Sequence, residues 1–448
     1  MAGRVQLATT GLRDKFFVDD PEFSYFNRVF QKTSNFARET IEIDPLSTPE
    51  FGSITRFRIR QDQGHFLSCV SLKLKLPPLP NRIPDGGTQY ATGWIDSVAH
   101  ALIEYVEIQI GEVPIQRLSS DYLAIHSEHE VTQTHQHALK HLVGKFPTRI
   151  ASLWAQHKSI QGHLGRAGES TEWYVDIPFW FYREPTLAIP LAALKEQEID
   201  IIVKLRDIDR LVVSSNQFVD WAARPPKPEG LQIESLTLDA EIVFVDEADV
   251  IRLKNSVTDY VITQIQEANF TVDPGQTSGR FRTQFVNPVK ELFFIVQRED
   301  KGGLLNYCAP HDYDNIRDDA GTEYGKYTDD GKLVLWENVD SISIKLDSDE
   351  ILNEKTGRAA FLKAVQGGIH HKKTQLIRRF YSYAFCTQPE ISAPTGSVNF
   401  TPIVSQVFDF KLHNNPHYRR DVRILAKSYN VLRVDGRAGF ARVLFNNN

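Results

Sequence analysis

Short segments in which apolar and polar residues alternate recur along the whole chain. A period of two places neighbouring side chains on opposite faces of an extended backbone, so each segment predicts a β-strand with one buried face. Strands with one apolar face are what two antiparallel sheets packed face to face require. The clearest segments span residues 56–60, 70–76, 106–110, 199–205, 236–242, 341–346 and 408–412.

Helical signals are sparse. The best candidates are His135–Val143, which Gly144 would end, and Asn353–Val365. Strand patterns do not alternate with helical ones, which argues against a parallel sheet. Long polar loops at residues 80–93 and 300–331 interrupt the strands. The pattern therefore predicts an all-β protein with long loops and few short helices.

A proline-rich segment, AARPPKPEG at residues 222–230, divides the chain into halves of similar length. Proline fixes φ and lacks a backbone donor, so this segment favours a stiff, extended connector. Strand patterns occur on both sides of it. We therefore expect an N-terminal extension at residues 1–25, a first sandwich at 26–221, a linker at 222–230 and a second sandwich at 231–448.

The composition of the 448 residues is that of a folded protein, with 41% hydrophobic and 24% charged residues. A formal net charge of −6 argues against direct binding of nucleic acid, which usually needs a basic excess. The three cysteines, Cys69, Cys308 and Cys386, have neither metal-ligand nor redox spacing. No apolar run approaches about 20 residues, and the N-terminus lacks a signal-peptide pattern, so we expect synthesis in the cytosol and no membrane insertion.

Six blocks of sequence resemble, in the same order, those of the major capsid proteins of nucleocytoplasmic large DNA viruses. The most specific is YSYAFCTQPEISAPTGSVNFT at residues 381–401, with its Pro-Glu, Pro-Thr-Gly and Asn-Phe elements. The closing turn differs, because Asp435–Ala438 stands where the family usually has Ser and Met. The other five blocks are QLATTGLRDKFFVDDPEFSYFNRVFQKTSNFARE (6–39), WIDSVAHALIEYVEIQIGEVPIQRL (94–118), IPFWFYREPTLAIPLAAL (177–194), FVNPVKELFFIVQ (285–297) and AKSYNVLRVDGRAGFA (426–441).

The resemblance implies a double jelly roll, that is, two consecutive eight-stranded antiparallel jelly-roll sandwiches. It also implies a structural protein of the virion capsid, which is not an enzyme and needs no cofactor. Three copies would form a homotrimer of roughly hexagonal outline, and these capsomers would tile the icosahedral shell of a large dsDNA virus. The expected partners are neighbouring capsomers and minor capsid proteins on the inner face. An internal membrane would lie beneath the shell, and assembly would take place in the host cytoplasm.

Seven histidines fall within residues 126–163. His137 and His141 are one helical turn apart, which could place two imidazoles on one ligand face, so they are weak metal candidates. Against a metal site, the segment has no cysteine, and His129-Glu130 lacks the second histidine of a zinc-protease helix. We interpret the segment as a solvated or subunit-facing loop without a metal, and we hypothesise that protonation near pH ~6 tunes assembly.

Catalytic motifs are not found: the sequence has no Walker loop, no dinucleotide fingerprint and no Gly-x-Ser-x-Gly elbow. The aromatic residues Trp173 and Phe179–Tyr182 could form a platform for sugars, which makes a carbohydrate-binding double β-sandwich protein the alternative interpretation. Half-buried strands also favour aromatic residues, so we prefer sandwich packing. We interpret Arg56, Arg58 and Arg60 as the solvent-exposed face of a strand. We interpret His370–Lys373 as a solvated loop or an intersubunit contact, and Asn399 as part of a turn.

Overall fold

The structure is a computed structural model. It describes residues 32–80, 82–85, 87–95, 97–132, 135, 138–139, 142–144, 171–195, 197–214, 228–299, 339–371, 380–414 and 419–445, and the positions 4, 5, 8, 11, 19–22, 24 and 26. The chain forms two compact units, Met1–Phe36 and Ala37–Asn448. The described positions before residue 27 are all exposed. The second unit contains the two sandwiches and the site described below.

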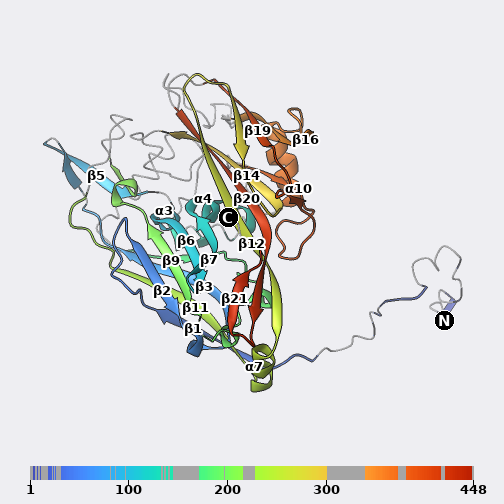
Figure 1. The fold of residues 1–448 in the computed structure, drawn as a ribbon. Coiled ribbons are helices and arrows are strands. Elements are labelled where there is room, and N and C mark those ends of the chain that lie inside the picture. The colour runs from blue at the N-terminus through green and yellow to red at the C-terminus, as the bar shows by residue number, and fades with distance from the viewer. Residues whose placement is uncertain are drawn as a thin grey trace. The chain divides into compact units, whose positions relative to one another are not determined.

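The first sandwich consists of two four-stranded sheets (Figure 1). One has the order β2-β9-β6-β7, formed by β2 (Ile54–Ile59), β9 (Ile199–Leu205), β6 (Ile103–Ile110) and β7 (Val113–Ser119). The other has the order β1-β11-β3-β8, formed by β1 (Phe36–Ile43), β11 (Ser235–Val245), β3 (Phe66–Leu76) and β8 (Thr171–Asp176). A small additional sheet contains β10 (Val212–Ser214), β5 (Thr88–Trp94) and β4 (Arg82–Asp85).

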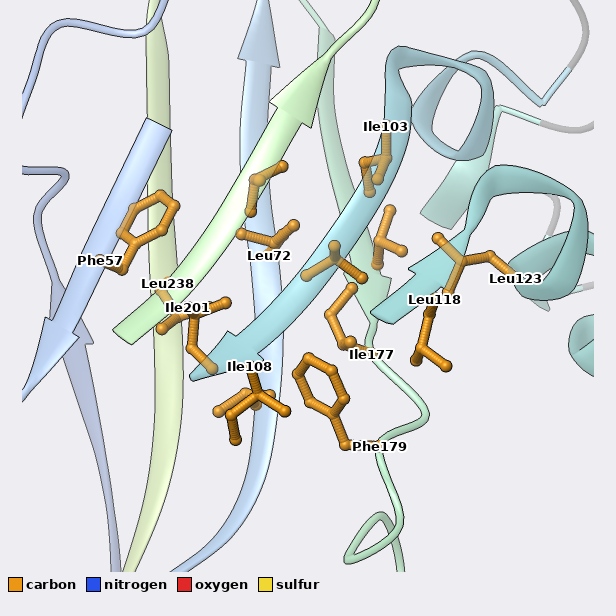
Figure 2. Close-up of a cluster of buried hydrophobic side chains, with 14 of the residues drawn as sticks. Phe57, Leu72, Ile103, Ile108, Leu118, Leu123, Ile177, Phe179, Ile201 and Leu238 are labelled. Atoms are coloured by element: carbon orange, nitrogen blue, oxygen red, sulfur yellow. The ribbon is translucent and has the colours of Figure 1, made fainter. Parts of the chain in front are cut away.

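The core of the first sandwich is built from the apolar half of each alternating segment. Figure 2 shows Phe57 and Ile201 from one sheet and Leu72 and Leu238 from the other among the buried side chains. All four have no exposed surface. The strands of these sheets pair in antiparallel fashion, for example with Phe57 opposite Ile201 and Leu238 opposite Leu72. The alternation therefore predicted both the strands and their buried faces correctly.

The second sandwich repeats this plan. One sheet has the order β12-β20-β14-β17, formed by β12 (Val257–Val272), β20 (Arg419–Asp435), β14 (Pro288–Glu299) and β17 (Phe380–Ala384). Two short strands extend it, because β18 (Val398–Asn399) pairs with β14 and β21 (Phe440–Val443) pairs with β20. The facing sheet has the order β13-β19-β15-β16, formed by β13 (Ser278–Thr283), β19 (Gln406–Leu412), β15 (Val339–Leu346) and β16 (Asp349–Leu352). The expected all-β double jelly roll is confirmed.

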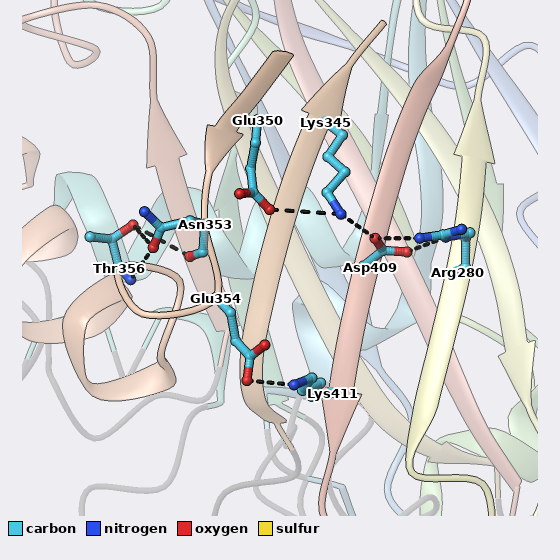
Figure 3. A network of polar contacts seen from close by, with 8 residues as sticks. All are labelled: Arg280, Lys345, Glu350, Asn353, Glu354, Thr356, Asp409 and Lys411. Atoms are coloured by element: carbon cyan, nitrogen blue, oxygen red, sulfur yellow. Dashed lines mark hydrogen bonds and ion pairs between the residues drawn. The ribbon is translucent and has the colours of Figure 1, made fainter. Parts of the chain in front are cut away.

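The outer face of this last sheet carries the polar half of the alternation (Figure 3). The guanidinium of Arg280 donates two hydrogen bonds to the carboxylate of Asp409, at 2.6 and 3.1 Å. Lys345 joins the same carboxylate at 3.3 Å and lies 3.7 Å from Glu350. These contacts link β13, β19, β15 and β16 across the sheet, whereas Phe408 on the opposite face of β19 is completely buried.

The two sandwiches share one sheet as their junction. Along β14, Phe293 belongs to a core that is continuous with the first sandwich, whereas its neighbour Phe294 belongs to the core of the second. Along β20, Leu425 belongs to the first of these cores and Ile424 to the second. A sheet that is apolar on both faces is normally a central layer. The second sandwich therefore docks on the first through a hydrophobic face.

Polar contacts reinforce this junction at its edges. Arg423 of β20 and Asp121 form an ion pair of 2.8 Å, and both side chains are largely buried. At the closing turn, the backbone N–H of Lys195 donates to the carbonyl of Gly439 at 2.9 Å. Asp435 accepts backbone hydrogen bonds from Arg437 and Ala438, at 3.0 and 3.1 Å. The turn whose sequence departs from the family pattern thus contacts the first sandwich.

The segment around the proline-rich linker differs from the expected division. Residues 215–227 lie outside the described residues, but β11, which follows them, pairs with β3 in the first sandwich, with Leu238 opposite Leu72. Prolines in this segment therefore mark a connection that leads into a strand of the first sandwich. We propose that the boundary between the sandwiches lies at helix α7 (Glu247–Lys254), with the first sandwich ending after β11.

The two helix predictions had different outcomes. Five of the nine residues of the expected helix 135–143 are described, and all five are helical: His135, Ala138, Leu139, Leu142 and Val143. Gly144 follows as a turn with a φ of 74°, as expected for the residue that ends the helix. The expected helix 353–365 begins only at α9 (Ala359–Phe361) and continues through a π-helical turn, η6 (Leu362–Gly367), into α10 (Gly368–His370). Asn353 accepts hydrogen bonds from the backbone and hydroxyl of Thr356, at 3.0 and 3.1 Å. Such local side-chain contacts favour a turn over a helix.

Candidate functional site

Helix α4 (Ser120–Glu130) positions the first half of the site. It follows β7 directly, and the hydroxyl of Ser119 accepts a hydrogen bond from the backbone N–H of Tyr122 at 3.4 Å, which caps the helix. The ring of Tyr122 lies edge-on to Phe293 of β14, with centroids 6.2 Å apart. The ring of His129 lies 5.7 Å from Phe293 and 4.9 Å from Phe380. The helix therefore packs against the shared sheet of the second sandwich.

Three potential ligand residues meet at this junction. His129 comes from α4, Glu291 from β14, and His371 from the residue after α10. One nitrogen or carboxylate oxygen of each lies within 4.8 Å of those of the other two. The side chains are 4%, 1% and 4% exposed, respectively. Nε2 of His371 contacts the carboxylate of Glu291, and its Nδ1 lies 3.8 Å from the carboxylate of Glu390.

The two imidazoles have different electrostatic surroundings. Burial, and then the neighbouring His371, lower the pKa of His129 well below its ordinary value, so this ring is neutral. Burial also acts to lower the pKa of His371, but the charge and hydrogen bond of Glu291 outweigh it and raise this pKa to about 9. In the absence of a ligand, His371 and Glu291 therefore form a buried ion pair beside a neutral ring.

A polar cavity of about 130 Å³ adjoins the three residues through Glu390. Burial and the charge of Lys427 lower the pKa of Lys290, another of its lining residues, to about 7. Lys290 donates a hydrogen bond to the carbonyl of Ile391 at 3.0 Å. The cavity is lined by both sandwiches, including His126, Glu130, Tyr182, Glu184 and Lys427. Acids and bases are mixed along its walls, so it lacks the single sign of charge that concentrates one class of ligand.

The structure places the histidines predicted from the sequence in different surroundings. His137 and His141, the weak metal candidates, lie outside the described residues. His129 and His371 were both assigned to solvated or subunit-facing segments, and both of these assignments are wrong because the side chains are buried between the sandwiches. His126 is partly buried, with Nε2 3.9 Å from the carboxylate of Glu130. The grouping of His129 with Glu291 and His371 has no local signal, because the three residues are far apart in the sequence.

The aromatic residues proposed as a sugar platform are mainly core residues. Trp173, Phe179, Trp180 and Phe181 are at most 9% exposed. Their rings pack on one another, for example Trp180 edge-on to Phe181 with centroids 5.1 Å apart. A sugar-binding platform needs an exposed ring face, so this arrangement does not favour the carbohydrate alternative.

The arginine stripe pairs with carboxylates of the adjacent strand, since Arg58 donates to Asp200 at 2.9 and 3.2 Å and lies 2.8 Å from Glu198. The side-chain oxygen of Asn399 accepts the backbone N–H of Thr401 at 3.1 Å, which confirms the predicted turn. Within the described part of the chain, no helix has the length and apolar character that crossing a membrane requires.

Two family models match nearly the whole chain. The model for the major capsid protein N-terminus matches residues 24–246, and the model for the large eukaryotic DNA virus major capsid protein matches residues 250–439. The border between the two matches falls at the start of α7. This agrees with the boundary proposed from the strand pairing.

Individual relatives and solved structures agree with these matches. The chain is 25% identical to the major capsid protein of Pyramimonas orientalis virus over 446 residues, which cover 98% of each chain. It is 26% identical to capsid protein 1 of Acanthamoeba polyphaga mimivirus over 322 residues, which cover 71% of this chain but only 52% of that protein. A quasi-atomic structure of the PBCV-1 virus capsid superimposes with a TM-score of 0.72 and 18% identity, over 95% of this chain and 100% of that one.

Proposed function

Because the chain belongs to the family of large eukaryotic DNA virus major capsid proteins, we propose that three copies associate into a capsomer of pseudo-hexagonal outline. The chain is a structural protein of the virion shell. One observation carries the proposal: the two sandwiches of a chain are fused through a sheet that is apolar on both faces. Each chain thus contributes two rigid lobes, and three chains around a threefold axis supply the six corners of a tile.

Further parts of the proposal concern partners. Neighbouring capsomers would contact one another through loops, and minor capsid proteins would bind on the inner face. The described positions before residue 27 are exposed, which supports a role in such a contact, since exposed side chains near a terminus are available to a partner. We include no direct contact with nucleic acid, because the net charge of −6 offers no basic excess. Assembly in the host cytoplasm, over an internal membrane into which the chain does not insert, completes the proposal.

The proposal includes no catalytic role. Ionisable groups buried at the junction are paired: Arg423 with Asp121 across the two sandwiches, and His371 with Glu291 within the second. Pairs of this kind fix the relative placement of two elements. This arrangement supports a structural use of the buried charges.

The test is the molar mass of the purified full-length chain, measured by light scattering coupled to size exclusion, with negative-stain images of the same fractions. A trimer of three 51.1 kDa chains has a mass of about 153 kDa. We expect this mass over a wide range of protein concentration and particles of six-cornered outline. A persistent 51.1 kDa monomer that binds sugars on a glycan array would refute the proposal and restore the carbohydrate alternative.

A further inference from the structure

We propose that His129, Glu291 and His371 form a structural zinc site that fastens the two sandwiches of one chain together. The inference goes beyond the role in the shell and does not depend on trimer formation, because all three residues belong to one chain. It differs from the weak metal candidates of the sequence, His137 and His141, which lie outside the described residues.

The donor set suits zinc. Two imidazole nitrogens and a carboxylate oxygen are among the ligands that Zn²⁺ uses in proteins, with bonds of about 2.0–2.2 Å. Ligand atoms that share one ion in tetrahedral geometry are therefore separated by about 3.4 Å. The three donor atoms already lie within 4.8 Å of one another. Small side-chain rotations bring them to a common ion, without movement of the strands.

A second observation points to a ligand at this position. Nδ1 of His129 is buried and has no hydrogen-bond partner among the described residues. Buried polar atoms of native proteins are nearly always paired, so an orphaned imidazole nitrogen needs an explanation. A bound metal ion would explain the unpaired nitrogen, because a second potential ligand is close by: the ring of His129 lies over that of His371, with centroids 3.8 Å apart.

A further feature is typical of metal sites. A histidine ligand usually offers its second nitrogen to a carboxylate, which fixes the orientation of the ring. Nδ1 of His371 faces the carboxylate of Glu390 at 3.8 Å, while Nε2 of the same ring faces Glu291. Glu390 is therefore assigned as a positioning residue, not as a ligand.

The location gives the ion a structural task. His129 stands on a helix of the first sandwich, whereas Glu291 and His371 belong to the second. All three ligands come together only when the sandwiches are docked. Binding energy that depends on docking is added to the stability of the docked state.

The first experiment uses the untagged full-length chain. After dialysis against EDTA and then against zinc chloride, we expect elemental analysis to find about one zinc ion per chain. The zinc-loaded protein should unfold at a higher temperature than the chelated protein in differential scanning calorimetry. With Co²⁺ in place of zinc, the three side chains and one water should give d–d bands with the intensity of a four-coordinate site. These measurements need no variant, so they remain decisive if a substitution prevents folding.

The second experiment compares matched variants. Glu291→Gln, His129→Gln and His371→Gln should each weaken zinc binding by more than about 100-fold, because each removes a ligand. Glu390→Gln should weaken it by about 10–100-fold, since it affects only the orientation of a ligand. His126→Gln is the control. This histidine lies on the same helix but outside the group, so zinc affinity should not change.

The site is overturned if zinc stays well below one ion per chain, or if the three ligand variants bind it as the wild type does. The fastening role is overturned if zinc binds but leaves the unfolding temperature unchanged. In the first case the residues act only as a buried His371–Glu291 ion pair beside a neutral His129. The molar mass of the same samples separates this result from the proposed function, because a zinc-free trimer would refute only the metal site.

Discussion

Replacing Phe293 by alanine tests whether the junction between the sandwiches is a true core. The ring is 3% exposed and lies edge-on to Tyr122 and His129 of α4, with centroids 6.2 and 5.7 Å away. Truncation of a buried phenylalanine costs about 3–5 kcal/mol. Each edge-to-face contact accounts for about 0.5–1.5 kcal/mol of such a loss. Since the site is almost wholly buried, we expect Phe293→Ala to lower the free energy of unfolding by about 4 kcal/mol.

Urea unfolding followed by tryptophan fluorescence is a suitable assay. The described tryptophans, Trp94, Trp173 and Trp180, all belong to the first sandwich, whereas Phe293 belongs to the second. With the other three tryptophans, Trp154, Trp221 and Trp336, replaced by phenylalanine in every variant, a shift of the tryptophan transition therefore reports the effect of one sandwich on the other. Phe440→Ala is the control, because this ring is 37% exposed and should contribute less than about 1 kcal/mol. A tryptophan transition that moves no further for Phe293→Ala than for Phe440→Ala would refute a shared core.

Two further predictions concern the second sandwich. A hydrogen bond from Arg280 lowers the pKa of Asp409 in the folded protein, so this carboxylate stabilises the fold above its unfolded pKa of about 3.9 and loses that contribution in acid. Asp409→Asn should lower the free energy of unfolding by up to about 1 kcal/mol at neutral pH and leave it unchanged in acid. Urea unfolding at several pH values measures this difference, and a difference that does not depend on pH would contradict the prediction. A Cβ on Gly357 would lie 1.7 Å from the carbonyl oxygen of Ile342, so Gly357→Ala should cost about 2 kcal/mol or more, whereas Gly368→Ala, with open space around it, should be tolerated in the same assay.

Much of the fold could be predicted from the sequence because its signals are local. In the strands that have one buried face, the side chains alternate between core and surface, as Phe408 and Asp409 do on β19, and this period is visible without knowledge of the partners. The order of the six sequence blocks then supplied the double jelly roll. The pairing of β11 could not be predicted, because strand pairing is not local: nothing in residues 235–245 indicates that the partner is β3 and not a strand of the second half.

The candidate site could not be predicted for the same reason. In the sequence, His129 is one of seven histidines in a polar segment, and His371 is part of a basic run. Glu291 lies inside an apolar strand, where a single carboxylate gives no pattern of its own. The three meet because α4 packs on the face of β14 that carries Phe293, and this packing follows from the docking of two sandwiches. Local patterns predict which residues are strands, but a site made by docking requires the tertiary structure.

The sheet formed by β12, β20, β14 and β17 leaves no hinge between the two sandwiches, since bending there would pull apart two hydrophobic layers at once. Any curvature of a shell built from this protein must then arise where separate chains touch, at edges and vertices. The single chain then keeps one shape in flat and in bent regions of a shell, and the contacts between chains determine the geometry of the particle.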